Sequence, residues 1–304
     1  MIVADLSIRD LLGLLAGPGL NLRTGQFVNR IFSGLKSVGE GLQLLYADYP
    51  LSESDDFTDF HVHVERPRDL RRWFRPQVLF RFDATVPFKP LPLHHAFPML
   101  EWGLNWCVSS HCHQYLVIHA AVVEKHGHAL ILPAPPGSGK STLCAGLVTR
   151  GWRLLSDELT LIDPASGQLV PVPRPIGLKN ASIEVIRRFA PGAVIGRSSS
   201  DTMKGTVAHM QAPRASVLCA KETALPGWIV FPRFIAGSPA RLQPWPKAHA
   251  FMRLADNAFN YSLHGAAGFE ALAQMVDRSL CFEFSYGDLE EAAALFAELR
   301  PPRA

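Results

Sequence analysis

The sequence predicts an α/β protein in which a smaller α+β module, residues 1–110, precedes an α/β domain over residues 111–304. Three observations predict this arrangement. An apolar run, a glycine-rich loop and a helix-like segment follow one another directly over residues 128–150. Short stretches that alternate apolar and polar residues recur upstream of it. A proline-rich connector, "VPFKPLPLHHAFP", separates those stretches from the rest of the chain.

The first module combines helix-like and strand-like patterns. The opening segment predicts a helix up to about Leu14, which the sequence "GPG" at residues 17–19 ends. The stretches "QFVNRIFSG", "DFHVHVERP" and "QVLFRFD" alternate as half-buried strands do. Apolar residues at helical spacing predict a further helix from Met99 to about His111. We therefore expect a small α+β unit here.

Composition and charge restrict the class of protein. A hydrophobic fraction of 48% with 19% charged residues is typical of a folded chain. The net charge of +3 is too small to indicate nucleic-acid binding. The basic segment "ERPRDLRRWFRP" is typical of a solvated surface, with a dock for an acidic partner or peptide as the alternative. Five scattered cysteines, and the lack of a signal-peptide pattern or a long apolar run, predict a cytoplasmic protein without a membrane partner.

A loop at "LPAPPGSGKST" has the pattern of a phosphate-binding site. Glycines allow backbone N–H groups to converge on phosphate oxygens, and the helix that begins at Gly-Lys-Ser adds the positive end of its dipole. Ala134 stands where the usual pattern has glycine, and the alternative is a glycine-rich turn with an incidental lysine. The residues expected to bind the phosphates are Pro136, Gly137, Ser138, Gly139, Lys140, Ser141 and Thr142.

Two adjacent acids, Asp157 and Glu158, follow the strand-like segment "WRLLS". Strands joined by one helix end at the same edge of a sheet when they are neighbours or nearly so, and the phosphate loop lies at that edge. An acidic pair on the next strand indicates a carboxylate aimed at a nucleophile, as phosphoryl transfer to an alcohol requires. The alternative is that "SDE" only ends a strand and begins a turn.

A histidine is expected close to this loop. The runs "YLVIHAAVVE" and "HALILPA" predict an antiparallel hairpin with its turn centred near His126. His119 then lies opposite Pro133, within one or two residues. The side chain of His119 is suited to orient the acids or contact phosphate, and an ordinary strand histidine is the equal alternative.

His119, "APPGSGKS" and "SDE" occur in the same order in the catalytic domain of HPr kinase/phosphorylase, which the chain resembles. The chain is more similar still to HPr-kinase-related kinases of type A, and this similarity extends over nearly the whole chain. That resemblance also includes "FPMLEWGLNWC", "GWRLLSDELTLID", "PRPIGLKN", "KGTVAH" and "FNYSL". It implies a P-loop domain of the phosphoenolpyruvate-carboxykinase and HPr-kinase type, and an ATP- and Mg²⁺-dependent kinase. The parent family forms hexamers, so a homo-oligomer stays open for this chain.

The resemblance also implies roles for single residues. Asp157 corresponds to the catalytic base, and Glu158 to a metal-associated acid where the parent family has aspartate. We expect Ser141 and Glu158 to hold Mg²⁺, and Lys140 to stabilise the transferred charge, with His119 as a further catalytic residue.

Basic and amide side chains further along the chain are candidates for phosphate or substrate contacts. Arg174, Lys179 and Asn180 lie in "RPIGLKN", and Lys204 lies in the polar segment "SSSDTMKGTVAH". The alternatives are a proline-glycine turn with a surface lysine for the first segment and an ordinary loop for the second.

The expected reaction is transfer of the γ-phosphate of ATP to a hydroxyl of a peptide or small protein acceptor. Serine is the expected acceptor residue. A nucleotide-dependent binding module without phosphotransfer is a second hypothesis. Ala134, and the lack of a later glutamate-bearing motif of the parent family, motivate it. A kinase acting on a small molecule is a third.

Overall fold

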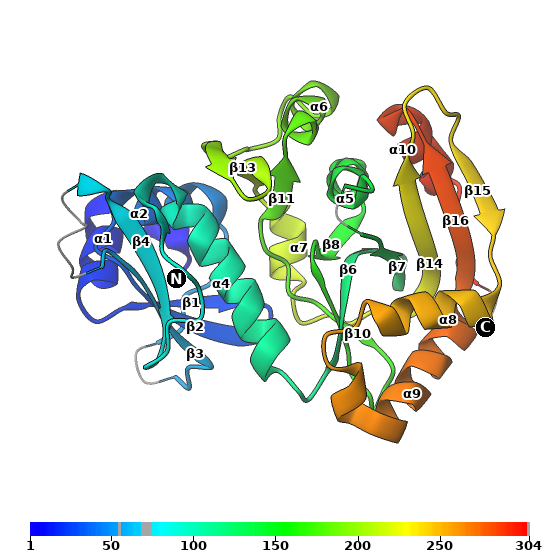
Figure 1. Ribbon diagram of the computed structural model, residues 1–304, viewed down its shortest axis with the longest axis horizontal. Helices are drawn as coiled ribbons and strands as arrows, with labels where there is room; N and C mark the ends of the chain where they lie inside the picture. The colour runs from blue at the N-terminus through cyan, green and yellow to red at the C-terminus, as the bar shows by residue number, and fades with distance from the viewer. Residues whose placement is uncertain (54–55, 68–73, 136, 303–304) are drawn as a thin grey trace.

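The computed structural model shows a mixed α/β architecture with several sheets, which confirms the predicted class at that level (Figure 1). None of the described helices has both the length and the apolar character required to cross a membrane. The predicted phosphate contact Pro136 and three arginines of the basic segment, Arg68, Arg71 and Arg72, lie outside the described residues. The structure describes residues 1–53, 56–67, 74–135 and 137–302.

The first sheet has the order β1-β2-β3-β4-β5, with β2 and β3 parallel and the other neighbours antiparallel. Buried and half-buried residues alternate along β3, because one face of this sheet packs against helices. The strands are β1 (Leu20–Thr24), β2 (Phe27–Phe32), β3 (Phe60–Glu65), β4 (Gln77–Phe82) and β5 (Leu91–Pro92). The helices around it are η1 (Val3–Asp5), α1 (Ile8–Ala16), α2 (Lys36–Leu45), η2 (Leu93–His95) and α4 (Ala96–His111).

The three strands expected in this region are confirmed as β2, β3 and β4, and the helix expected from Met99 begins three residues earlier. β1 and α2 were not expected. Glycines fit α2 closely against its neighbours: a Cβ atom at Gly41 would lie 2.2 Å from the Phe97 ring. A Cβ atom at Gly39 would lie 2.6 Å from the side chain of Leu12. Gly39 and Gly41 lower the helix propensity of α2, but its close packing requires them.

The second sheet has the order β10-β9-β6-β7-β14-β16-β15, and β8 also pairs with β6. β14 runs parallel to β7 and β16, whereas β6 runs antiparallel to β7, β8 and β9. Strands β7 and β8 are thus parallel to each other with β6 between them, which meets the condition of near neighbours on which the predicted meeting of the loop and the acids depends. The strands are β6 (Leu116–Lys125), β7 (His128–Pro133), β8 (Arg153–Ser156), β9 (Leu159–Ile162), β10 (Leu169–Val170), β14 (Leu225–Phe234), β15 (Arg241–Pro244) and β16 (Leu280–Tyr286).

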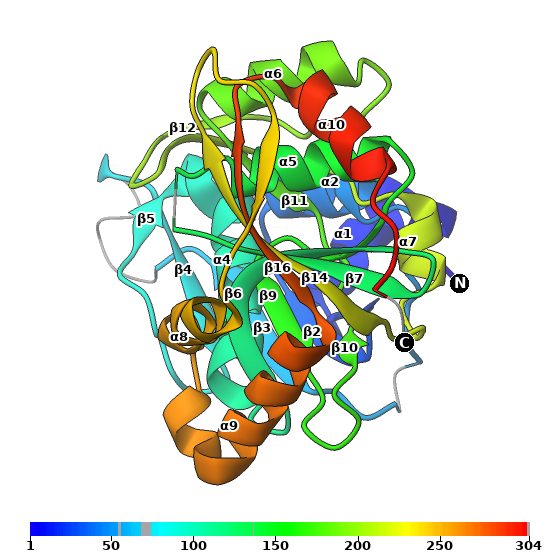
Figure 2. The same cartoon turned by 90° about the vertical axis from the view of Figure 1, so that its right-hand side faces the viewer.

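Helices cover both faces of this sheet (Figure 2). Alternate residues of β6 point to opposite faces: Val117 and Ala121 join the core that contains α5, whereas Ile118 and Ala120 join the core beneath α9. This alternation places His119 on the α5 face. The covering helices are α5 (Lys140–Thr149), α8 (Lys247–Asp256), α9 (Tyr261–Arg278) and α10 (Leu289–Ala297).

The hairpin of β6 and β7 closes through a two-residue turn. His126 and Gly127 both have positive φ, 55° and 81°, as the turns that match the twist of paired strands require. The register pairs Ala120 with Pro133, so His119 lies one residue away from its expected partner. The one-residue difference arises because the turn centre falls between His126 and Gly127.

A third sheet, with the antiparallel order β11-β13-β12, lies between α4 and α5 (Figure 1). "SSSDTMKGTVAH", interpreted as a loop or lid, instead forms a hairpin. The alternative of a simple turn for "RPIGLKN" is wrong as well, because its second half is a strand. The elements here are β11 (Ile176–Lys179), α6 (Ala181–Phe189), β12 (Ser199–Thr202), β13 (Gly205–Met210) and α7 (Arg214–Leu218).

Candidate active site

The glycine-rich loop joins the end of β7 to the start of α5, as the sequence predicted. Gly137 and Gly139 have φ values of 86° and 90°, a region that residues with a Cβ atom rarely adopt. The Tyr286 hydroxyl donates a hydrogen bond of 2.9 Å to the carbonyl of Gly139. The N-terminus of α5 has no side-chain cap among the described residues, so its dipole faces the loop uncompensated by a capping side chain.

Lys140, the first residue of α5, lies beside His119. Its side chain is buried, and its Nζ atom lies 3.3 Å from Nε2 of the histidine. Burial, followed by the charge of Lys140, lowers the pKa of His119 to about 4. Burial also lowers the pKa of Lys140. At neutral pH the imidazole is therefore uncharged and can accept a hydrogen bond from the ammonium group.

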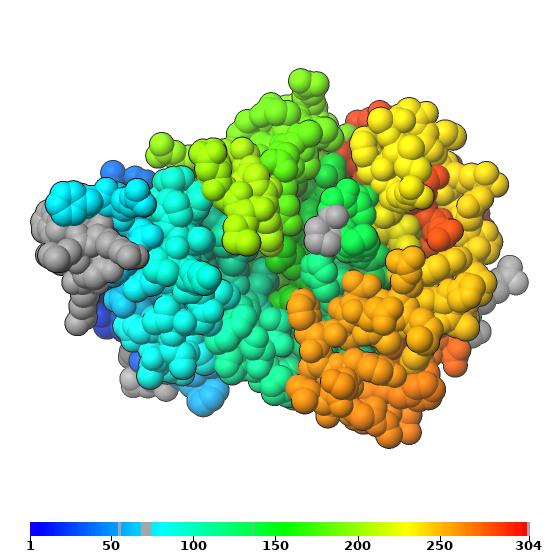
Figure 3. Space-filling view, in the orientation of Figure 1, coloured from blue at the N-terminus to red at the C-terminus, as the bar shows by residue number. Residues whose placement is uncertain are grey.

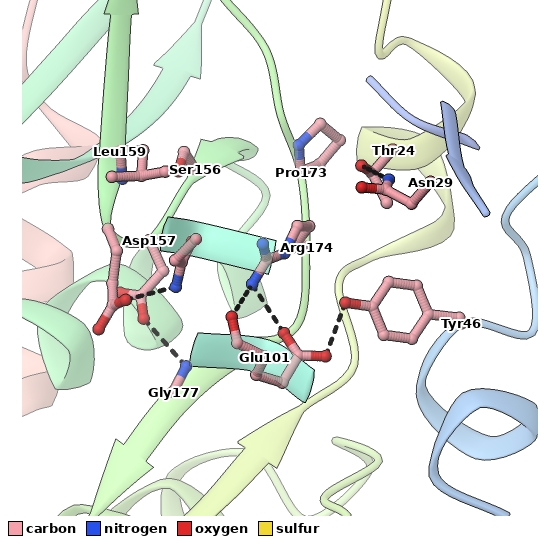
Figure 4. Close-up of polar contacts among 12 residues, drawn as sticks. Thr24, Asn29, Tyr46, Glu101, Ser156, Asp157, Leu159, Pro173, Arg174 and Gly177 are labelled. Atoms are coloured by element: carbon pink, nitrogen blue, oxygen red, sulfur yellow. Dashed lines mark hydrogen bonds and ion pairs between the residues drawn. The ribbon is translucent and has the colours of Figure 1, made fainter. Parts of the chain in front are cut away.

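Asp157 lies in the turn between β8 and β9, and its carboxylate is held from one side. The backbone N–H of Gly177 donates a hydrogen bond of 2.9 Å to Oδ2 (Figure 4). The other oxygen, Oδ1, is buried and has no hydrogen-bond partner among the described residues. Burial raises the pKa of Asp157, and the charge of Lys140 opposes that effect. An orphaned carboxylate oxygen is therefore available to a group that enters the site.

Glu158 faces more positive charge than its neighbour does. Asn105 of α4 donates a hydrogen bond of 2.5 Å to Oε2, and the Nζ atom of Lys179 lies 3.9 Å from Oε1. Burial acts to raise the pKa of Glu158, but the charges of Lys204, Lys140 and Lys179 outweigh it and the pKa is lowered. The two acids thus have opposite shifts, with Glu158 the more firmly ionised of the pair.

Arg174 is held inside the protein by Glu101 of α4. Its Nη2 atom donates two hydrogen bonds of 2.9 Å, one to the carbonyl oxygen and one to Oε2 of Glu101 (Figure 4). The hydroxyl of Tyr46, the residue that follows α2, donates to Oε1 of the same glutamate at 2.7 Å. Arg174, expected as a phosphate or substrate contact, therefore already has a carboxylate partner that links the β11 segment to α4 and α2.

The remaining candidates lie on the third sheet. Lys179 ends β11, and Lys204 lies in the turn of the β12–β13 hairpin, with its Nζ atom 5.5 Å from the centre of the Trp102 ring. Asn180 fastens the hairpin: its side chain accepts from the N–H of Thr206 and donates to the carbonyl of Lys204. Asn180 thus contacts the hairpin backbone, whereas the charges of Lys179 and Lys204 both lower the pKa of Glu158.

The acid turn, β11 with its approach, α4 and β13 line a pocket that is partly open to solvent. The described residues of the glycine-rich loop, with Lys140 and His119, are not among the residues that line it. Figure 3 shows the surface hollowed between α4 and the α8–α9 segment, beside the β12–β13 hairpin. Ser141 and Thr142 are half-buried in the first turn of α5. The residues that line the pocket from the acid turn, β11 and its approach include Asp157, Glu158, Arg174, Gly177 and Lys179; those from α4 and β13 include Glu101, Trp102, Asn105, Val207 and His209.

Sequence reasoning missed the contribution of α4 and of Gly177. The segment "MLEWGLNWCVSSH" was interpreted as a structural helix from its apolar spacing. The available signal was a polar pair within it: Glu101 and Asn105 are four residues apart, so they lie on one face of a helix that is otherwise largely apolar. No sequence pattern pointed to the N–H of Gly177.

Residues 99–176 match a family described as SynChlorMet cassette protein ScmC. The matched segment begins within α4 and ends at the first residue of β11, so it contains the loop, α5 and the acid pair. No curated protein matches the chain.

Proposed function

We propose that the protein is a Mg²⁺- and ATP-dependent kinase that transfers the γ-phosphate to a hydroxyl, a serine in the first place, of a peptide or protein. We also propose that residues 111–304 form a P-loop domain of the HPr-kinase type. One observation carries this proposal. The buried carboxylate of Asp157 is oriented by the N–H of Gly177, keeps Oδ1 unpartnered among the described residues, and interacts electrostatically with the lysine of the glycine-rich loop.

The residues present fit a nucleotide and its metal. The Oγ atom of Ser138 is buried in the loop and has no partner among the described residues, as a group that awaits a phosphate oxygen would be. At Gly139, a Cβ atom would lie 2.4 Å from the Tyr286 hydroxyl, so the loop keeps its shape only with glycine. Ser141 and Glu158 offer the hydroxyl and carboxylate oxygens that Mg²⁺ prefers alongside phosphate.

Each residue has a distinct task in this scheme. Bound Mg²⁺ neutralises the negative charge of the phosphates and so makes phosphoryl transfer easier. Lys140 stabilises phosphate charge, and the neutral His119 fixes the position of its ammonium group. Asp157 accepts at Oδ1 the proton that the acceptor hydroxyl loses as its oxygen bonds to the γ-phosphorus. The bond from that phosphorus to the β–γ bridging oxygen breaks, and ADP leaves. The raised pKa of Asp157 suits this role, because a general base works best when its pKa approaches the working pH.

Transfer of label from [γ-³²P]ATP tests the proposal. The purified protein is incubated with Mg²⁺ and a library of serine-containing peptides, and each peptide has a matched version in which alanine replaces the serine. We expect Mg²⁺-dependent labelling of serine peptides and none of their alanine counterparts. A protein that binds Mg·ATP but labels no peptide in the library would instead support a nucleotide-dependent binding module.

A further inference from the structure

α4 packs on the first sheet, yet one face of it lies against the acid pair. Glu101, Trp102 and Asn105 line the same pocket as Asp157 and Glu158. These α4 side chains follow the spacing of one helical face. A helix that only supported the first sheet would not need two polar side chains directed into the pocket.

We propose that Asn105 is a positioning residue for Glu158, so that α4 is a working part of the site; this rests on the proposed function. The Asn105 amide donates a hydrogen bond of 2.5 Å to Oε2 of Glu158. The other oxygen, Oε1, lies 3.9 Å from the Nζ atom of Lys179. An amide N–H is a donor only, so the contact directs one carboxylate oxygen of Glu158 toward α4. Asn105 thereby fixes the orientation of the acid expected to hold Mg²⁺.

α4 cannot move away from the acids without breaking other buried contacts. One turn before Asn105, Glu101 is joined to Arg174 by an ion pair of 2.9 Å in which both side chains are buried. Tyr46 holds the second oxygen of Glu101. Three residues after Arg174, the N–H of Gly177 holds Asp157. The two acids are therefore positioned from connected elements, Glu158 by α4 directly and Asp157 by the strand that α4 anchors.

The test replaces Asn105 by leucine, which has a similar volume and no donor. Isothermal titration of Mg²⁺ into the complex with a non-hydrolysable ATP analogue should show binding about 10- to 100-fold weaker than in the wild-type protein, as loss of a contact behind a metal ligand typically causes. Affinity for the analogue without Mg²⁺ should be unchanged. The matched control is Gln43→Leu, which removes an amide donor from α2 that contacts the carbonyl of Leu6 instead of the pocket.

A second variant keeps an amide donor at this position. Asn105→Gln should bind Mg²⁺ more tightly than Asn105→Leu, because its side chain can still donate to a carboxylate oxygen of Glu158.

The outcomes separate this proposal from the proposed function. If the wild-type protein shows no Mg²⁺-dependent binding of the ATP analogue, the proposed function is wrong and the role of Asn105 is wrong with it. If the wild-type protein binds and Asn105→Leu binds Mg²⁺ equally well, only the role of Asn105 is overturned.

Discussion

Replacing Asp157 by asparagine is expected to reduce kcat for phosphotransfer by about 100- to 10,000-fold, the range that general-base catalysis supplies. Asparagine keeps the shape of the side chain and an oxygen to accept from Gly177, but it cannot take a proton from the acceptor hydroxyl. Affinity for Mg·ATP should change little, because the metal-holding role falls to Glu158 and Ser141. Label transfer and nucleotide titration on the same preparation measure both quantities.

The control for this variant is Asp277→Asn, which makes the same change at an exposed side chain on α9. It should leave kcat and affinity at wild-type values. An equal loss of nucleotide affinity and of kcat in Asp157→Asn would remove Asp157 from the role of base. In the wild-type protein, the raised pKa of Asp157 places the acidic limb of the kcat profile at higher pH than an ordinary aspartate would, because only the ionised form accepts the proton.

Replacing Gly139 by alanine should abolish tight nucleotide binding and destabilise the fold. Its φ of 90° costs a residue with a Cβ atom about 1–2 kcal/mol. That atom would also lie 2.4 Å from the Tyr286 hydroxyl and 3.0 Å from Cβ of Phe234, an overlap that forces the loop or β16 to shift at a further cost of about 1–3 kcal/mol. Denaturant unfolding and nucleotide titration measure the two effects.

The same helix offers a matched control at its other end. Gly151 has a φ of 92° and no heavy atom within 4 Å of an added Cβ atom. Gly151→Ala should therefore lower the free energy of unfolding only by the cost of its positive φ, and it should leave nucleotide affinity unchanged. Adding Tyr286→Phe to Gly139→Ala removes the nearest clashing atom and should recover part of the lost stability. If Gly139→Ala and Gly151→Ala destabilise equally and both bind nucleotide normally, the described loop shape is not the binding shape.

The loop, α5 and the acid pair could be predicted because their signals are local. A strand, a glycine-rich turn and a helix lie within 22 consecutive residues from His128 to Thr149, and the acids follow one short strand later. His119 could be placed because residues alternate along a strand and the hairpin turn is short. Its register was one residue off, since a turn with two central residues has no single residue at its centre.

The contacts of α4 could not be predicted, because they join residues far apart in the sequence. Asn105 and Glu158 are 53 positions apart, and Glu101 and Arg174 are 73 apart. The apolar spacing of α4 identifies a helix but does not say which element its polar residues meet. The β12–β13 hairpin was missed for a different reason. β12 is polar and largely exposed, and the hydroxyl of Thr202 bonds the backbone of the turn, so no apolar pattern indicates the strand.

A crystal structure with Mg²⁺ and a non-hydrolysable ATP analogue tests the central claim most directly. We predict a terminal phosphate beside Lys140, Mg²⁺ contacted by Ser141 and Glu158, and Oδ1 of Asp157 facing the side from which an acceptor hydroxyl would approach. A terminal phosphate that lies away from the acid pair, or an analogue bound outside the glycine-rich loop, would contradict the account.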